Sequence, residues 1–262
     1  MNTDEIKKRL ARLQEKKTST PGNGKRWRDN FWKPESGKKH EIRLLKYKHS
    51  DDTLPFTELY FYFNIGKPRM LSLVNFDETD PILEFSSELR KQVDIKDPKM
   101  KKLLSDMKPK MRVFTPVIVR GEEDKGVRMW EFGPAVYTEL LQYMDDEDYG
   151  NILDVKEGFD IKLEVIPAEQ SGQLYPTTNV RMKPRTSPLS EDAELVEKWL
   201  EDQPNVKKLY NKVEYDEMKS NLQEWVGPKL EGSGGEELEG TNYTNTPKKD
   251  VNKQLDSLFD ED

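Results

Sequence analysis

Apolar and polar residues alternate along several short segments in the middle of the chain, most clearly at residues 159–166 (FDIKLEVI). Alternation with a period of two places the apolar side chains on one face of a β-strand. Residues 56–63 are the most aromatic of these segments, and a turn at residues 34–37 separates two others in a hairpin pattern. The pattern predicts strands at residues 31–33, 40–47, 56–63, 70–74, 111–119, 126–132, 159–166 and 179–183.

Apolar residues at helical spacing mark the other ordered segments. Two of these segments, 80–93 and 97–107, begin with Asp followed by Pro, which are favoured at the cap and the first position of a helix. The last helix is expected to end at Gly227-Pro228. The predicted helices are residues 4–17, 80–93, 97–107, 133–144, 190–202 and 214–226.

The two ends of the chain differ from its middle. The first helix is short and amphipathic, with Ile6, Leu10 and Leu13 at helical spacing, and a helix of this length is marginal in isolation. We therefore expect residues 1–24 to form a flexible arm that docks on another surface. Residues 229–262 contain a Gly-rich linker and too few apolar residues for a core, so a disordered tail is expected there.

The order of the elements indicates the fold class. Five or more strands with an interposed helix are typical of a small closed barrel, of which the OB-fold is the usual nucleic-acid-binding version. The predicted fold is α+β and mainly β, with an OB-fold core, a five-stranded Greek-key barrel, at residues 25–228. Within this core, a helical subdomain is expected at about residues 64–108.

Charge is distributed unevenly along the chain. Residues 1–50 carry fifteen Lys and Arg against six Asp and Glu, whereas residues 229–262 carry four against nine. The formal net charge is −7, yet several aromatic strands carry Lys and Arg while the acid is concentrated in helical segments and the tail. This distribution is typical of a protein that binds a polyanion and whose acidic tail competes for the same groove.

Composition excludes several classes of protein. The chain has no cysteine, which excludes disulfides, thiol catalysis and thiolate metal ligands, and its two histidines cannot form a metal site alone. No window approaches the roughly 18 apolar residues that a membrane span needs. The N-terminus lacks the apolar run of a secretory signal, so we expect neither a membrane protein nor an exported one.

Aromatic and basic residues share one face of several predicted strands, which suits a protein that stacks bases and contacts phosphates. We expect the tyrosines of residues 60–63 to point outward and the phenylalanines inward; the alternative is that all of these rings belong to the core. The basic–aromatic pairs are Arg112 with Phe114 and Arg128 with Trp130. The residues predicted to contact nucleic acid are Tyr60, Tyr62, Lys110, Arg112, Phe114, Arg128, Trp130, Tyr175, Arg181 and Lys183.

Acidic clusters offer little support for catalysis or metal binding. Residues 145–148 (DDED) read as a solvated turn because they lack the glycine and spacing of a calcium loop. The chain has no Ser/His/Asp arrangement, phosphate-cradling loop or HExxH motif, so no enzyme activity, metal or cofactor is predicted. The alternatives left open are an OB-fold adaptor that binds RNA or another protein and, as a third class, a hydrolase or nuclease.

Five short motifs occur in an informative order. They are residues 41–45 (EIRLL), 54–56 (LPF), 114–120 (FTPVIVR), 130–133 (WEFG) and 256–262 (DSLFDED). Together they resemble the single-stranded DNA-binding proteins of T-even-type bacteriophages. The resemblance implies cooperative, largely sequence-independent binding of single-stranded DNA in phage DNA replication, recombination and repair, in the cytoplasm of the infected bacterial host. It also places Trp130 at a DNA-stacking tyrosine position and Phe114 at an aromatic position beside the cleft.

The same resemblance implies roles for both ends of the chain. Family members self-associate along DNA through a Lys/Arg-plus-Ser/Thr motif in the arm, and they recruit replication and recombination proteins through an acidic tail that also modulates access to DNA. The implied cooperativity residues are Lys7, Lys8, Arg9, Lys16, Lys17, Thr18 and Ser19. The implied partner-binding residues are Asp256, Leu258, Phe259, Asp260, Glu261 and Asp262.

One departure from the family pattern concerns zinc. Known members hold a zinc ion on Cys and His after the aromatic hairpin, but this chain has Asp80-Pro81-Ile82-Leu83 where a Cys-Pro-x-Cys pair would lie. We therefore expect this lobe to be stabilised by hydrophobic packing instead. The residues predicted to supply that packing are Leu71, Leu73, Ile82, Leu83, Phe85 and Leu89.

Overall fold

The computed structural model describes residues 27–231 as a mixed α+β fold with eight strands and seven α-helices. The described residues form two compact units, each assembled from segments that are distant in the sequence. Unit 1 comprises residues 27–56, 115–131 and 136–205, and unit 2 comprises residues 57–114, 132–135 and 206–231. No helix within these residues is long and apolar enough to cross a membrane. The predicted α+β class is confirmed, whereas the closed OB-fold barrel stays a prediction.

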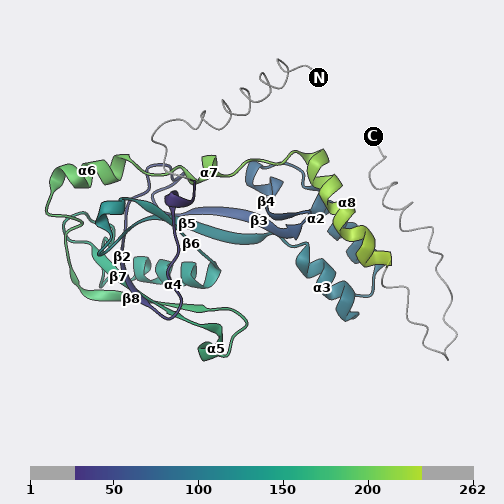
Figure 1. The fold of residues 1–262 in the computed structure, drawn as a ribbon, viewed down its shortest axis with the longest axis horizontal. Helices are drawn as coiled ribbons and strands as arrows, with labels where there is room; N and C mark the ends of the chain where they lie inside the picture. Colours follow the sequence, from purple (N-terminus) through teal and green to yellow (C-terminus); the bar gives the residue numbers. More distant parts are fainter. Residues whose placement is uncertain (1–26, 232–262) are drawn as a thin grey trace, which may run out of the picture. The chain divides into compact units, whose positions relative to one another are not determined.

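Unit 1 contains most of the strands. Its elements are η1 (Trp27–Asn30), β1 (Phe31–Trp32), β2 (Lys39–Leu44), residues 115–119 of β5 (Lys110–Val119), η3 (Glu123–Lys125), β6 (Arg128–Phe132), α4 (Pro134–Asp145), β7 (Phe159–Ile166), α5 (Ala168–Ser171), β8 (Thr177–Thr186) and α6 (Ala193–Glu201). The strand order is β1-β6-β5-β2-β7-β8 (Figure 1). β2 is antiparallel to both β5 and β7, and β7 is antiparallel to β8. Residues far apart in sequence thus form one sheet.

The pairing of β1 differs from the sequence prediction. The predicted hairpin around residues 34–37 is wrong, because β1 is parallel to β6 instead of pairing with β2. β1 has only two residues, and its Trp32 packs edge-on against Trp130 of β6 with ring centroids 6.1 Å apart. Burial of the two indoles favours this pairing over a local hairpin.

A buried ion network ties the strands of unit 1 together. The Arg43 guanidinium on β2 is 1% exposed, and its Nε lies 3.0 Å from Oδ1 of Asp160 on β7. Its Nη2 donates to the carbonyl and hydroxyl oxygens of Ser187, both at 2.7 Å. Arg120 contributes a second contact to Asp160 at 2.9 Å. Burial lowers the pKa of Arg43, and the Asp160 carboxylate beside it opposes that shift.

Unit 2 combines a small sheet with helices. Its elements are β3 (Thr57–Ile65), β4 (Lys67–Leu71), η2 (Leu73–Phe76), α2 (Pro81–Gln92), α3 (Pro98–Asp106), residues 110–114 of β5, α7 (Val206–Leu209) and α8 (Tyr215–Glu231). β3 lies between β4 and β5 and is antiparallel to both. The turn between β3 and β4 needs Gly66, which has φ +65° and where an added Cβ would lie 2.6 Å from Asn221 Cβ of α8.

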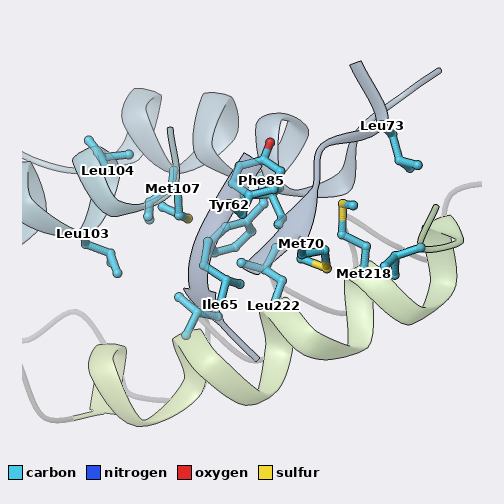
Figure 2. Packing of buried hydrophobic residues seen from close by; sticks show 14 residues of the cluster. Tyr62, Ile65, Met70, Leu73, Phe85, Leu103, Leu104, Met107, Met218 and Leu222 are labelled. Atoms are coloured by element: carbon cyan, nitrogen blue, oxygen red, sulfur yellow. The ribbon is translucent and has the colours of Figure 1, made fainter. Parts of the chain in front are cut away.

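The core of unit 2 lies where β3, β4, α2 and α3 meet α8. Figure 2 shows Met218 and Leu222 of α8 facing Ile65 and Met70. The buried cluster consists of Tyr62, Ile65, Met70, Leu73, Ile82, Phe85, Leu89, Leu103, Leu104, Met107, Val213, Met218, Leu222 and Val226. The predicted packing is confirmed for Leu73, Ile82, Phe85 and Leu89; Leu71 is buried outside the cluster, and Leu83 is half-buried.

The buried carboxylate of Asp80 organises this core. Its Oδ1 accepts hydrogen bonds from the Tyr62 hydroxyl at 3.0 Å and from the backbone of Ile82 at 3.0 Å. Its Oδ2 accepts from the Ser72 hydroxyl at 2.6 Å and from Leu73 N at 2.9 Å. One buried carboxylate thereby joins β3, η2 and the N-terminus of α2, with its charge favoured by the helix dipole.

Two predicted boundaries are wrong. Residues 73–74 belong to η2 instead of a strand, because Ser72 caps this short helix by accepting a hydrogen bond from Val74 N. α8 does not stop at Gly227-Pro228 but continues to Glu231, where Leu230 packs against the unit 2 core. The predicted arm and nearly all of the predicted tail lie outside the described residues.

Candidate nucleic-acid interface

Three predicted stacking rings are buried, so the expectation that they are exposed is wrong. Tyr62 lies in the unit 2 core, and its hydroxyl donates a hydrogen bond to Asp80. Burial is the main cause that raises the pKa of Tyr62, and the negative charge of Asp80 adds to it. Phe114 is fully buried against Phe61, with ring centroids 6.2 Å apart. Trp130 packs on Trp32 and is 1% exposed. In this conformation none of these rings can stack on a base; apolar packing outweighs exposure at each position.

Arg128 is also a structural residue in this conformation. It is buried, and its Nη2 lies 2.7 Å from Oε2 of Glu122 in the β5–β6 connection. Lys125 and Arg128 hold the pKa of Glu122 below its usual value. The ion pair therefore closes the β5–β6 connection and engages Arg128 in this conformation, while its contact with DNA stays a prediction.

A cluster of four aromatic rings around Arg69 lies on the sheet of unit 2, on the face opposite to Tyr62. The Arg69 guanidinium of β4 lies 3.7 Å from the ring centroid of Phe61 and 4.9 Å from that of Tyr210. Phe63 and Phe114 lie somewhat farther away, at 5.5 and 5.8 Å. We call Arg69 and these four rings the aromatic cluster. Cation–π contacts of this kind orient a guanidinium beside the rings.

Two predicted DNA-binding cations lie beside the aromatic cluster. Lys110 is exposed and is paired in the β5–β3 register with Phe61, while Arg112 is half-buried and paired with Leu59. Their side chains share a face with Phe114 because the three positions alternate along β5. Tyr60 is half-buried on the opposite face, where its backbone N–H donates to Asn75. The structure thus brings Lys110, Arg112 and Phe114 together but separates Tyr60 from them.

Two residues of the aromatic cluster were missed by sequence reasoning. Arg69 precedes the apolar end of its strand. Tyr210 lies about 100 residues after Phe114 of β5, whose ring it contacts. The Arg69 position carries a usable signal, since Arg69 alternates with Lys67 along β4 and so shares its face. Tyr210 has no such signal, because its position depends on the path of the chain after α7.

A charged groove lies on unit 1. It follows the polar face of β2, β7 and β8, where the register aligns Lys39 with Glu164 and Asn179, and Glu41 with Lys162 and Arg181. Its volume is about 370 Å³. We call this feature the charged groove; it is lined by Lys39, His40, Glu41, Lys162, Leu163, Glu164, Asn179 and Arg181.

Cations outnumber anions at the charged groove. Lys39 pairs with Glu164 at 3.3 Å, and Glu41 receives Lys183 at 2.9 Å and Lys162 at 3.8 Å. The exposed Arg181 adds a further positive charge. Two carboxylates thus position lysines across the strands, and four cations in all give this face a net positive charge of the kind that follows a phosphate backbone.

The most exposed apolar residues of unit 1 lie in the connection between β7 and β8. Tyr175 is 77% exposed and the neighbouring Leu174 is 90% exposed. They follow α5, which lies in the connection that joins these two strands (Figure 1), and Gly172, which ends α5 with φ +67°. The predicted role of Tyr175 in DNA binding stays a prediction, and Leu174 is an exposed neighbour that the sequence reasoning did not single out. An exposed ring on the hairpin that forms the charged groove is available for base stacking.

No group of three or more His, Asp and Glu in residues 27–231 is arranged to hold a metal ion. The acidic residues 145–148 are exposed, and Asp146 accepts a hydrogen bond from Asp148 N, as in a solvated turn. The predicted cooperativity and partner-binding residues all lie outside the described part of the chain, so their roles stay predictions.

Comparison with known proteins identifies a family. A family model described as gp32 DNA binding protein like matches residues 37–226, which include both the aromatic cluster and the charged groove. No curated protein sequence matches the chain.

Proposed function

The chain belongs to the gp32-like family of DNA-binding proteins, and we propose that it is a cooperative, largely sequence-independent single-stranded DNA-binding protein of phage DNA replication, recombination and repair. The observation that supports this most strongly is the family match over residues 37–226. An OB-type barrel in unit 1 and a location in the infected host's cytoplasm are parts of the proposal.

In this proposal the charged groove and the residues beside the aromatic cluster both contact DNA. The cations of the charged groove neutralise phosphates, and Tyr175 stacks on a base beside it. Lys110 and Arg112 contribute further phosphate contacts next to the aromatic cluster in unit 2. Phosphate contacts and stacking carry no base identity, which accounts for the weak sequence preference.

The ends of the chain complete the proposal. The arm, with Lys7–Arg9 and Lys16–Ser19, makes the contact between neighbouring molecules on one strand. The acidic tail, with Leu258 and Phe259 as apolar anchors, recruits replication and recombination proteins and competes with DNA for the cationic surfaces.

A competition experiment tests the assigned ligand. Full-length protein on labelled oligo-dT is challenged with unlabelled single-stranded DNA, duplex DNA and RNA of equal length, and the labelled complex is followed by fluorescence anisotropy. We expect single-stranded DNA to compete best by a wide margin. Equal or better competition by RNA or duplex, or failure to bind oligo-dT, would contradict the proposal.

A further inference from the structure

A second groove in unit 1 lies between the β5–β6 connection and α6. Its volume is about 320 Å³, and it is lined by residues 123–127 together with Leu195, Lys198, Trp199 and Asp202. The half-buried Leu195 packs against a buried apolar cluster that includes Val127 and Trp199. The groove thus combines an apolar floor with a charged rim, and its volume is within the range of small binding sites. We call it the acidic groove.

The acidic groove has a net negative charge, since its lining contains three Asp and Glu against two Lys, and acid is denser in the segments around it. Residues 190–202 contain six Asp and Glu against one Lys, and residues 122–125 contain three against one. Asp124, Glu194 and Asp202 are all exposed. A surface of this sign repels a phosphate backbone, so it is unsuited to DNA and suits a basic partner.

One segment of this chain has the complementary chemistry. Residues 1–26 contain eight Lys and Arg against three Asp and Glu, and Ile6, Leu10 and Leu13 recur at helical spacing. A basic amphipathic segment binds by placing its apolar residues in a groove and its cations on an acidic rim. We propose that the acidic groove binds the N-terminal arm of a second copy of this chain.

This inference rests on the proposed function and specifies how neighbouring copies meet. Each copy has one arm and one acidic groove, so the contact joins two different surfaces and can repeat from copy to copy along a strand. In the proposed function, phosphates occupy the cationic surfaces. DNA therefore does not compete with the arm for binding to the acidic groove.

Charge reversal tests the inference in the full-length protein. The triple variant Asp124→Lys, Glu194→Lys and Asp202→Lys changes only exposed side chains. The matched control reverses three exposed acidic residues of the same unit, Asp145→Lys, Glu147→Lys and Asp148→Lys. Affinity is measured for an oligo-dT that holds one protein and for long poly-dT, and the ratio of the two reports cooperativity.

We expect the groove variant to lower the ratio of poly-dT affinity to oligo-dT affinity by about tenfold or more, because cooperativity depends on this one contact between copies. Its affinity for the short oligonucleotide should not fall. The control should keep the ratio of the unaltered protein. A second variant, Lys7→Glu, Lys8→Glu and Arg9→Glu, should also lose cooperativity, and combining it with the groove variant in one chain should restore it.

Equal ratios for the groove variant and its control would overturn the inference, as would a combined variant without restored cooperativity. If the unaltered protein does not bind the short oligonucleotide at all, the proposed function fails and this inference with it. Normal short-oligonucleotide binding with an unchanged ratio contradicts the acidic groove alone.

Discussion

A single carboxylate, Asp80, accepts hydrogen bonds from two side chains and from three backbone N–H groups, counting the longer contact from Leu83 N at 3.3 Å. These donors come from three segments that the sequence separates by turns. Apolar packing by Leu73, Ile82 and Phe85 then encloses the carboxylate.

Replacing this carboxylate should weaken the fold strongly. Asp80→Ala leaves buried donors unsatisfied and removes a helix cap, so we expect a loss of about 3 kcal/mol in the free energy of unfolding. Asp97→Ala, which removes the half-buried cap of α3 on Lys99 N, should cost about 1 kcal/mol. Urea unfolding of both variants compares the two sites. Equal losses would show that Asp80 is an ordinary helix cap.

The buried Tyr62 hydroxyl makes stability depend on alkaline pH. Its raised pKa means that the folded state holds the phenolic proton more tightly than the unfolded state. The resulting stability is complete below the ordinary tyrosine pKa of about 10 and declines as the pH rises above it. Urea unfolding between pH 9 and 11 should show a shallower decline for Tyr62→Phe than for the unaltered protein; identical slopes would contradict the account.

At the scale of elements, the β7–β8 hairpin carries both the cationic strand positions and the exposed Tyr175. Strand alternation predicted the polar face of residues 159–166, whereas the exposure of Tyr175 was not predicted from the sequence. The groove itself was not predictable, because it depends on the register that sets Lys162 between Glu41 and Arg181. Pairing across more than 100 residues leaves no local pattern.

The aromatic strands illustrate the opposite case. Alternation placed Tyr62 and Phe61 on opposite faces, as observed, but could not show that helices would cover the tyrosine face. That coverage depends on α8, which lies about 150 residues further along the chain. Trp130 likewise became a core residue because a two-residue strand packs beside it. Exposure of a ring is thus set by distant elements, and sequence alone leaves it open.

Removing one cation from the charged groove should weaken DNA binding in a specific way. Arg181→Ala is expected to lower affinity for oligo-dT and to reduce the slope of log K against log salt by about 0.7, the value for one phosphate contact on a single strand. Lys102→Ala is the control, because this exposed lysine of α3 pairs with Asp106 at 2.7 Å. The same slope for Arg181→Ala and the unaltered protein would remove Arg181 from the interface.

The exposed ring on the hairpin gives an independent test of stacking. Tyr175→Ala should weaken oligo-dT binding by about 1–3 kcal/mol with no change in the salt slope, because stacking releases no counterions. Tyr175→Phe keeps the ring and should bind like the unaltered protein. Anisotropy titrations at several salt concentrations measure both quantities, and an equal loss in the two variants would assign the effect to the hydroxyl instead.

At the scale of the whole molecule, a net charge of −7 accompanies local cationic surfaces. Acid is dense in residues 190–202 and in the tail, while Lys39, Lys162, Arg181 and Lys183 gather on one sheet face. The distribution of charge therefore matters more for the ligand than its sum. In the proposed function, separating the signs in this way provides one surface for phosphates and another for the basic arm of a second copy.

The salt dependence of single-stranded DNA binding tests the central claim most directly. Full-length protein is titrated with oligo-dT across a series of salt concentrations, and log K is plotted against log salt. With four cations at the charged groove, we predict a linear decrease with a slope of about −2 or steeper. A slope near zero, or no binding at low salt, would contradict the account.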